Sequence, residues 1–341
     1  MGLTENELSE TQLAEKTDAV ETKNAMYKAG LFFMILMILE VPLSLLVGVF
    51  QMMVSGKYQV LVSVLMNQGF LLAGAAVYIL VTKTDLKKDL WVRKYRLSTF
   101  FLSLVALLTA IPMAQWLNVI SQLFAKNRTN ATIEQLTQSI PAVLGIAVIG
   151  CLPGFVEETL FRGIVFSAFR KRSILTGIVI SSLSFGLLHM NFNQIFYTVY
   201  FGIVFALMVE ATGSIVSTMI LHMLFNGINM LVVYLLPIYY KWMGTFSEEY
   251  ANVDVSAMLN AAQAKDQLIL TIVIWTPFAI GGVVLTILLL NAIAKLNGRS
   301  IAWKTICGEK EQTAKIKPLN IPLIIGWIIC LSFAILDLVF S

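Results

Sequence analysis

The chain has 341 residues, of which 58% are hydrophobic and only 13% are charged, and its formal net charge is +4. This composition excludes an ordinary soluble domain and predicts a polytopic helical membrane protein. The basic residues lie in short loops beside apolar segments, so nothing in the sequence indicates nucleic-acid binding. Three cysteines without a CxxC pair provide neither a disulfide framework nor a cysteine metal site.

The apolar segments predict how the chain is organised. Residues 1–27 are polar and mainly acidic, and we expect a mobile or partly helical cytoplasmic tail there. Segments near the roughly 20 residues that a membrane helix requires follow this tail. We predict an all-α bundle of about eight to nine spans, at about 29–54, 58–81, 98–124, 141–169, 173–190, 193–211, 214–236, 267–294 and 321–340. The fifth and sixth segments are short and closely joined, so one of them is expected to be tilted or re-entrant.

The loops between these segments predict an orientation. Lysine and arginine concentrate in the loops at 82–97, 170–172 and 295–317. Because such loops favour the cytoplasmic side, we expect a multi-pass protein of a bacterial cytoplasmic membrane with its N-terminus inside. Outside, the aromatic residues of 237–242 predict an interfacial belt, and about 247–264 fits a short amphipathic helix.

Three ionisable residues lie within the fourth apolar segment: Glu157, Glu158 and Arg162. Charges at that depth are costly, so a functional site is the default hypothesis. On an α-helix Glu158 and Arg162 share one face, which predicts an ion pair. Glu157 points about 100° away and is five residues from Arg162, so we expect its carboxylate to be available for chemistry. The alternative is a purely structural ion-pair network.

Other acidic residues within the apolar segments are given structural interpretations. Glu40 lies mid-span in the first segment, close to Pro42. Pairing with a neighbouring helix is favoured for it over lining a cavity. Glu210 and Asp337 lie near segment ends, where we expect them to reach water, and we assign them no function.

Both histidines of the chain lie within apolar segments. His189 follows Phe185 by one turn, so that ring is expected to pack against the imidazole. His222 and Asn226 are four residues apart and share one helix face. At about 1.5 Å per residue, Glu157, His189, His222 and Asn226 lie about 12 to 24 Å from the cytoplasmic ends of their helices. These side chains are therefore expected to converge at one depth.

The three motifs EExxxR, FxxxH and HxxxN, in this order on successive segments, resemble the CPBP family of CAAX proteases and bacteriocin-processing enzymes, also called the Abi family. These are intramembrane endopeptidases that include the type II CAAX prenyl protease. The resemblance implies that Glu157 and His189 activate a hydrolytic water. It also implies that His222 and Asn226 stabilise the oxyanion.

The same resemblance implies that Glu158 and Arg162 hold the first motif in shape. The resemblance covers the catalytic CPBP core at 141–236. The apolar segments divide the rest of the chain into a polar tail at 1–27, N-terminal membrane helices at 28–140, an external loop at 237–266, and C-terminal membrane helices at 267–341. Close relatives typically have eight spans, one fewer than the nine segments counted here.

A metal site is the main chemical alternative. Glu157, His189 and His222 form a set of ligand types that zinc accepts, with an open position for water. The chain lacks HExxH, and the amide of Asn226 suits an oxyanion better than zinc. We therefore favour a reaction without a cofactor, with zinc as the alternative.

Two other functions remain open at this stage. A bacteriocin-immunity or regulatory scaffold would keep the motifs as a structural network without cleaving anything. A transporter with a proton relay would also place Glu and His in the membrane, but the sequence has no inverted repeat to support one. For an endopeptidase, we expect the partners to be the lipid bilayer and a peptide or membrane-protein substrate, such as a prenylated C-terminus, a bacteriocin leader or a pheromone.

Overall fold

The structure is a computed structural model that describes residues 5–127, 137, 139–247, 264–308 and 311–340. Within these ranges the chain is helical and contains no β-strand, which confirms the predicted all-α bundle. Eight helical stretches are long and apolar enough to cross a membrane. They are Glu15–Met53, Gly56–Thr82, Leu97–Gln122, Ala142–Arg170, Phe192–Thr212, Ile215–Met243, Lys265–Leu296 and Ile321–Phe340.

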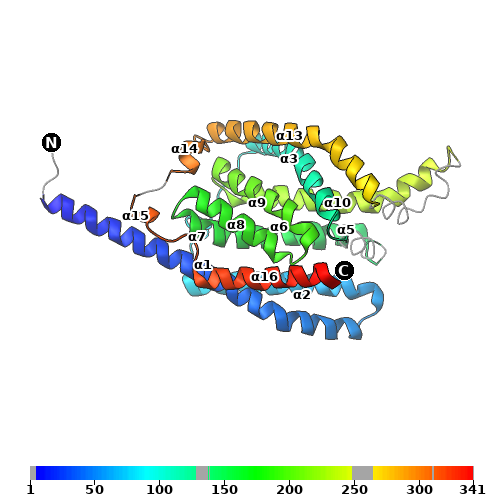
Figure 1. Cartoon of the computed structure of the whole chain (residues 1–341), viewed down its shortest axis with the longest axis horizontal. Helices are drawn as coiled ribbons and strands as arrows, with labels where there is room; N and C mark the ends of the chain where they lie inside the picture. The colour runs from blue at the N-terminus through cyan, green and yellow to red at the C-terminus, as the bar shows by residue number, and fades with distance from the viewer. Residues whose placement is uncertain (1–4, 128–136, 138, 248–263, 309–310, 341) are drawn as a thin grey trace.

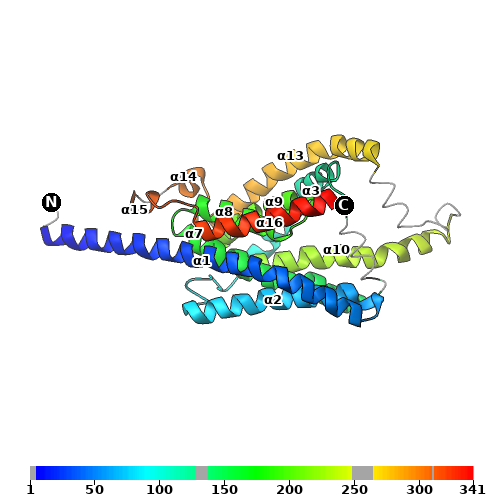
Figure 2. The same cartoon turned by 60° about the horizontal axis from the view of Figure 1, so that its bottom comes forward.

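The polar tail and the first span form one helix. Helix α1 runs from Glu5 to Met53 without interruption, and its first turns extend well past the rest of the bundle (Figure 1). A short helix, η1 (Gly56–Tyr58), then leads into α2 (Gln59–Thr82), which returns beside α1 (Figure 2). Helix α3 (Leu97–Gln122) packs against α9 and α13.

The fourth span forms the centre of the bundle and departs from the predicted α-helix. It consists of α5 (Ala142–Gly145), η2 (Ile146–Cys151), α6 (Leu152–Glu158), η3 (Thr159–Phe166) and α7 (Ser167–Arg170), in which η2 and η3 are π-helical. Every residue of η3 is buried, because α1, α2, α8, α9 and α10 contact it on different sides. Two π-helical segments therefore flank the Glu157–Glu158 pair, and such segments are frequent at functional sites.

The fifth predicted segment is a short helix. Helix α8 runs from Ile174 to Leu188, about 22 Å at 1.5 Å per residue, and so falls short of a bilayer core of about 30 Å. His189 caps it, and Met190 has a left-handed φ of 46° that turns the chain sharply. The side chain of Asn191 then accepts from the Gln194 amide and starts α9 (Phe192–Thr212).

The last part of the chain surrounds this core. Helix α10 runs from Ile215 to Met243, past the predicted end of the segment near 236, and Pro237 lies within it. The amphipathic helix expected at about 247–264 falls almost entirely outside the described residues. Helix α13 (Lys265–Leu296) packs on α3, and α14 (Trp303–Ile306) and α15 (Glu311–Ala314) precede α16 (Ile321–Phe340), which packs on α1 (Figure 1).

Gly150 of η2 and Gly154 of α6 bring these two segments into close contact with α10. A Cβ added to Gly150 would lie 2.9 Å from the Cα of Gly227. One added to Gly154 would lie 2.7 Å from the backbone nitrogen of Met223. Small residues four apart let membrane helices approach at backbone distance. This contact fixes the first motif, which begins at Glu157, beside the third motif on α10.

The prediction that Glu210 reaches water was wrong. Its carboxylate is only 2% exposed and pairs with the guanidinium groups of both Arg170 and Arg299. The two guanidinium carbons lie 4.3 and 5.0 Å from the centre of the Trp91 ring. Glu210 therefore joins the ends of α7 and α9 to the chain after α13. The sequence did not reveal this, because its partners lie 40 and 89 residues away.

Candidate active site

A buried ion pair anchors the first motif. Glu158 and Arg162 both have side chains with 0% exposure, and Arg162 Nη1 donates to Glu158 Oε1 at 2.8 Å. This is the pair that their spacing predicts, and it forms although Arg162 lies in a π-helical turn. The guanidinium lies 4.5 Å from the ring centre of Phe185 and 5.3 Å from that of Phe205. The charge is thus compensated by one carboxylate and two aromatic faces.

The same carboxylate holds the third motif. His222 Nδ1 donates to Glu158 Oε1 at 2.9 Å, which fixes the hydrogen on that nitrogen because a carboxylate accepts. The other ring nitrogen, Nε2, lies 3.8 Å from Glu157 Oε2. That distance is longer than a hydrogen bond. Glu158 therefore orients an imidazole whose far side faces Glu157.

Glu157 lines a cavity of about 530 Å³. Its carboxylate is 10% exposed, and Oε1 accepts from Gln68 Nε2 at 3.2 Å. Arg162 pairs with Glu158 rather than with Glu157. The prediction that one carboxylate is held and the other faces an open space therefore agrees with the geometry.

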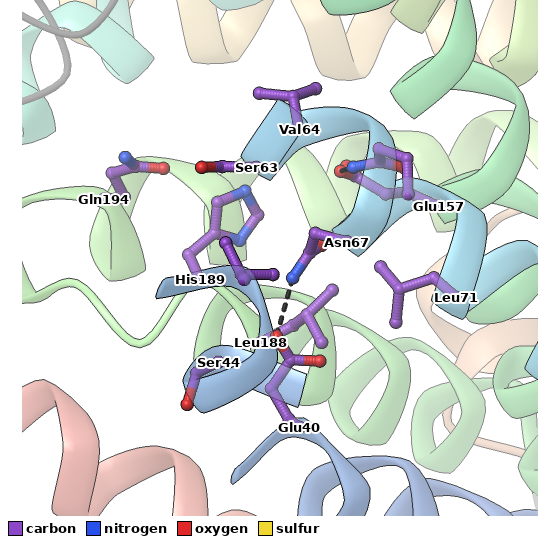
Figure 3. A pocket seen from close by; sticks show the side chains of 12 residues that line it. Glu40, Ser44, Ser63, Val64, Asn67, Leu71, Glu157, Leu188, His189 and Gln194 are labelled. Atoms are coloured by element: carbon purple, nitrogen blue, oxygen red, sulfur yellow. Dashed lines mark hydrogen bonds between the residues drawn. The ribbon is translucent and has the colours of Figure 1, made fainter. Parts of the chain in front are cut away.

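His189 lines the same cavity, across from Glu157 (Figure 3). Its Nδ1 donates to the carbonyl oxygen of Phe185 at 2.9 Å, so Nε2 of the neutral ring is left with a lone pair. The Phe185 and His189 rings meet edge to face, with centres 5.2 Å apart, as their spacing predicts. Phe185 therefore positions this imidazole through both its carbonyl and its ring.

The third motif lies behind the cavity rather than on its wall. His222 is buried between both glutamates and the Phe185 and Phe205 rings, and it does not line the cavity. Asn226, one turn further along α10, is half-buried, and its side chain makes no hydrogen bond to any residue in the described ranges. The structure thus brings Glu157 and His189 to one space and His222 next to Glu157.

Helix α2 contributes two side chains that the sequence reasoning missed. Gln68 donates to Glu157, and its neighbour Asn67 donates through Nδ2 to Glu40 Oε1 at 2.6 Å. Glu40 therefore pairs with a neighbouring helix, as expected, and it also lines the cavity (Figure 3). The sequence could have indicated these two residues, because Asn67 and Gln68 are adjacent polar residues in the middle of an apolar span.

The acidic and imidazole side chains do not form a preassembled metal site. Among the described residues, no three His, Cys, Asp or Glu side chains are grouped to hold a metal ion. Glu157 and His189 line the cavity, whereas His222 lies behind it. A zinc ion bound by Glu157, His189 and His222 would therefore require the three side chains to move together.

The family model described as "Type II CAAX prenyl endopeptidase Rce1-like" matches residues 139–228, which contain all three motifs. Residues 139–228 are therefore similar to a domain of the CPBP family. The matched model describes prenyl endopeptidases, and the eight apolar helices of the described chain agree with a multi-pass membrane protein. Searches of curated proteins and of solved structures gave no match. The matched residues include Glu157, His189, His222 and Asn226.

Proposed function

We propose that this protein is an intramembrane endopeptidase in which Glu157 and His189 activate a water molecule to hydrolyse a peptide bond. The observation that carries the proposal is their meeting in one cavity among membrane-spanning helices, with the Glu158–Arg162 pair compensated separately behind them. Placing ionisable groups at that depth is costly, so their presence favours a functional site. Peptide hydrolysis requires a base for water, a proton for the leaving amine and donors for the oxyanion.

The proton for this reaction follows from the charges of the site. Arg162 compensates Glu158, so the negative charge of Glu157 is left without a fixed positive partner. An uncompensated buried charge is costly, so the Glu157 carboxylate is suited to take up a proton during the reaction. When Glu157 takes a proton from the attacking water, it can later return that proton to the amine nitrogen as the C–N bond breaks.

His189 suits the role of a second acceptor for the water. Because the Phe185 carbonyl holds the Nδ1 hydrogen, the Nε2 lone pair is directed elsewhere and can accept a hydrogen bond from water in the cavity. A water held by one carboxylate oxygen and one imidazole nitrogen keeps a lone pair for attack on a carbonyl carbon. Glu157 and His189 therefore hold the nucleophile between them.

His222 and Asn226 are proposed to stabilise the oxyanion. They lie on one face of α10, and the Asn226 amide is not engaged by any described residue. An amide N–H is a good donor to developing negative charge and needs no charge of its own. In His222, Glu158 holds Nδ1, so a protonated Nε2 would be the nitrogen that donates to the oxyanion.

The membrane setting is proposed as follows. The basic loops favour a cytoplasmic N-terminus and a bacterial cytoplasmic membrane. The catalytic core corresponds to residues 141–236, and the substrate is a peptide or protein that reaches the site from the bilayer, whether a CAAX-type C-terminus, a bacteriocin leader or another membrane-associated segment. Helices α1 and α2 complete the cavity from outside the core, since Glu40, Asn67 and Gln68 line it.

Comparative proteomics of cells that produce either the wild type or Glu157→Gln tests this function. Peptides carrying new N- and C-termini are labelled and compared between the two cell populations. We expect a set of cleavage products present only with the wild type. Identical termini in both populations, at equal protein levels, would contradict the endopeptidase and favour the scaffold, which tolerates a nearly isosteric change. A proton or solute flux that depends on Glu157 would favour the transporter.

A further inference from the structure

Two polar side chains that line the cavity, Glu40 and Gln68, each have a buried oxygen atom without a hydrogen-bond partner among the described residues. Glu40 accepts from Asn67 through Oε1, whereas its Oε2 is buried and has no hydrogen-bond partner among the described residues. Gln68 is only 8% exposed and donates to Glu157, and its Oε1 is also buried without a partner in the described chain. Both atoms are acceptors, so each lacks a hydrogen-bond donor.

The charge of the cavity points to a cation. Among the described residues, its walls carry two carboxylates, Glu40 and Glu157, one imidazole, and no lysine or arginine. The other polar walls are hydroxyl and amide side chains, from Ser44, Ser63, Asn67, Gln68 and Gln194. A buried carboxylate without a positive partner is costly, and a cation that enters the site recovers that cost. The Asn67 hydrogen bond holds the Glu40 carboxylate in a fixed orientation before any ligand arrives.

We propose that Glu40, oriented by Asn67, is a specificity subsite for a basic side chain of the substrate, a lysine or arginine near the peptide bond to be cleaved. This inference rests on the proposed peptidase function, because Glu40 shares its cavity with Glu157 and His189 (Figure 3). The ammonium or guanidinium group pairs with the Glu40 carboxylate in the cavity. Glu40 is then a binding residue that selects which bond reaches Glu157.

A synthetic peptide library tests the subsite. The peptides are N-acetylated, so that the only cations are side chains, and they are incubated with purified enzyme in lipid nanodiscs. Cleavage positions are read by mass spectrometry. The variants are Glu40→Gln, which keeps the shape and the Asn67 hydrogen bond, and Glu40→Asp, which keeps the charge. Glu21→Gln, exposed on the same helix and outside the cavity, is the matched control.

The wild type and Glu21→Gln are expected to cleave with lysine or arginine enriched at one fixed position from the scissile bond. For a lysine peptide against its norleucine counterpart, kcat/KM should differ by about tenfold to a hundredfold, the range of a desolvated charge pair. Glu40→Gln should lose this preference while still cleaving the norleucine peptide, and Glu40→Asp should retain it.

Three results would overturn the subsite. The first is a wild type that cleaves without any preference for lysine or arginine, and the second is a Glu40→Gln enzyme that keeps this preference. The third is a preference that appears only when the peptides have free N-termini, which would assign the cation to the peptide's own amine. Each of these leaves cleavage intact and therefore leaves the peptidase function standing. A wild type that cleaves no peptide in the library counts against both proposals.

Discussion

The two adjacent glutamates should respond very differently to the same substitution. Glu158 has 0% exposure and accepts charge-assisted hydrogen bonds from Arg162 at 2.8 Å and His222 at 2.9 Å. In Glu158→Gln the Arg162 guanidinium keeps its burial and loses its compensating charge. Its Nε and Nη2 atoms have no partner elsewhere in the described chain. Removing one partner of a buried pair costs about 3–5 kcal/mol.

The Glu157→Gln substitution should lower the free energy of unfolding much less. The carboxylate faces a cavity, pairs with no arginine, and receives one hydrogen bond from Gln68 at a long 3.2 Å. An amide oxygen at the same position accepts that bond, so the expected loss lies within about 1 kcal/mol. The difference between the two variants should therefore be at least about 2 kcal/mol, although both exchange a glutamate for a glutamine.

The free energy of unfolding in mixed micelles, titrated with a denaturing detergent, measures this difference. In the unfolded state Glu158 and Arg162 are exposed to solvent, where an ion pair contributes little free energy. The Glu158→Gln substitution therefore destabilises mainly the folded state. Glu21→Gln, exposed on α1, gives the baseline for a glutamate-to-glutamine change. Equal losses in Glu157→Gln and Glu158→Gln, or a larger loss in Glu157→Gln, would refute the assignment of one structural and one free carboxylate.

Three further predictions concern the oxyanion, the metal and the helix contact. Asn226→Ala should lower kcat by about 10²–10³ with KM changed far less, and Asn226→Asp should be slower still, because a carboxylate repels the oxyanion; an unchanged kcat, or a defect in KM alone, would remove Asn226 from the mechanism. Activity should survive exhaustive chelation, with no stoichiometric metal in the purified protein; one zinc per chain, with activity lost on chelation and restored by zinc, would contradict this. Gly154→Ala should cost about 1–3 kcal/mol of stability and lower kcat, because its Cβ would lie 2.7 Å from the Met223 backbone, next to His222. Gly69→Ala is the matched control, since nothing lies within 4 Å of its added Cβ; equal behaviour of the two alanine variants would rule out the tight contact.

Local spacing was enough to predict the parts of the site that lie on one helix. Glu158 and Arg162 pair as their four-residue separation indicates, and Phe185 packs on His189 one turn later. These contacts depend only on helix periodicity, which the sequence displays directly. The all-α bundle was likewise predictable, because a long apolar segment in a bilayer has to satisfy its own backbone hydrogen bonds.

Contacts between distant segments were not predictable in this way. Gln68 reaches Glu157 across 89 residues, and Asn67 reaches Glu40 across 27. Nothing in their spacing reveals these partners, because they depend on how α2 packs against α1 and α6. The π-helical turns on both sides of Glu157–Glu158 also escaped prediction. An apolar run gives similar periodicity in α- and π-helical form, and tertiary packing selects between them.

The rate at which purified Glu157→Gln cleaves a peptide identified by the proteomic comparison tests the central claim most directly. The claim is that Glu157 and His189 activate the hydrolytic water. A general base contributes about 10²–10⁴ to the rate, so kcat of Glu157→Gln should fall by at least about 10², with the unfolding free energy nearly unchanged. The kcat of His189→Ala should fall by a comparable factor. A folded Glu157→Gln enzyme that cleaves the peptide as fast as the wild type would contradict the account.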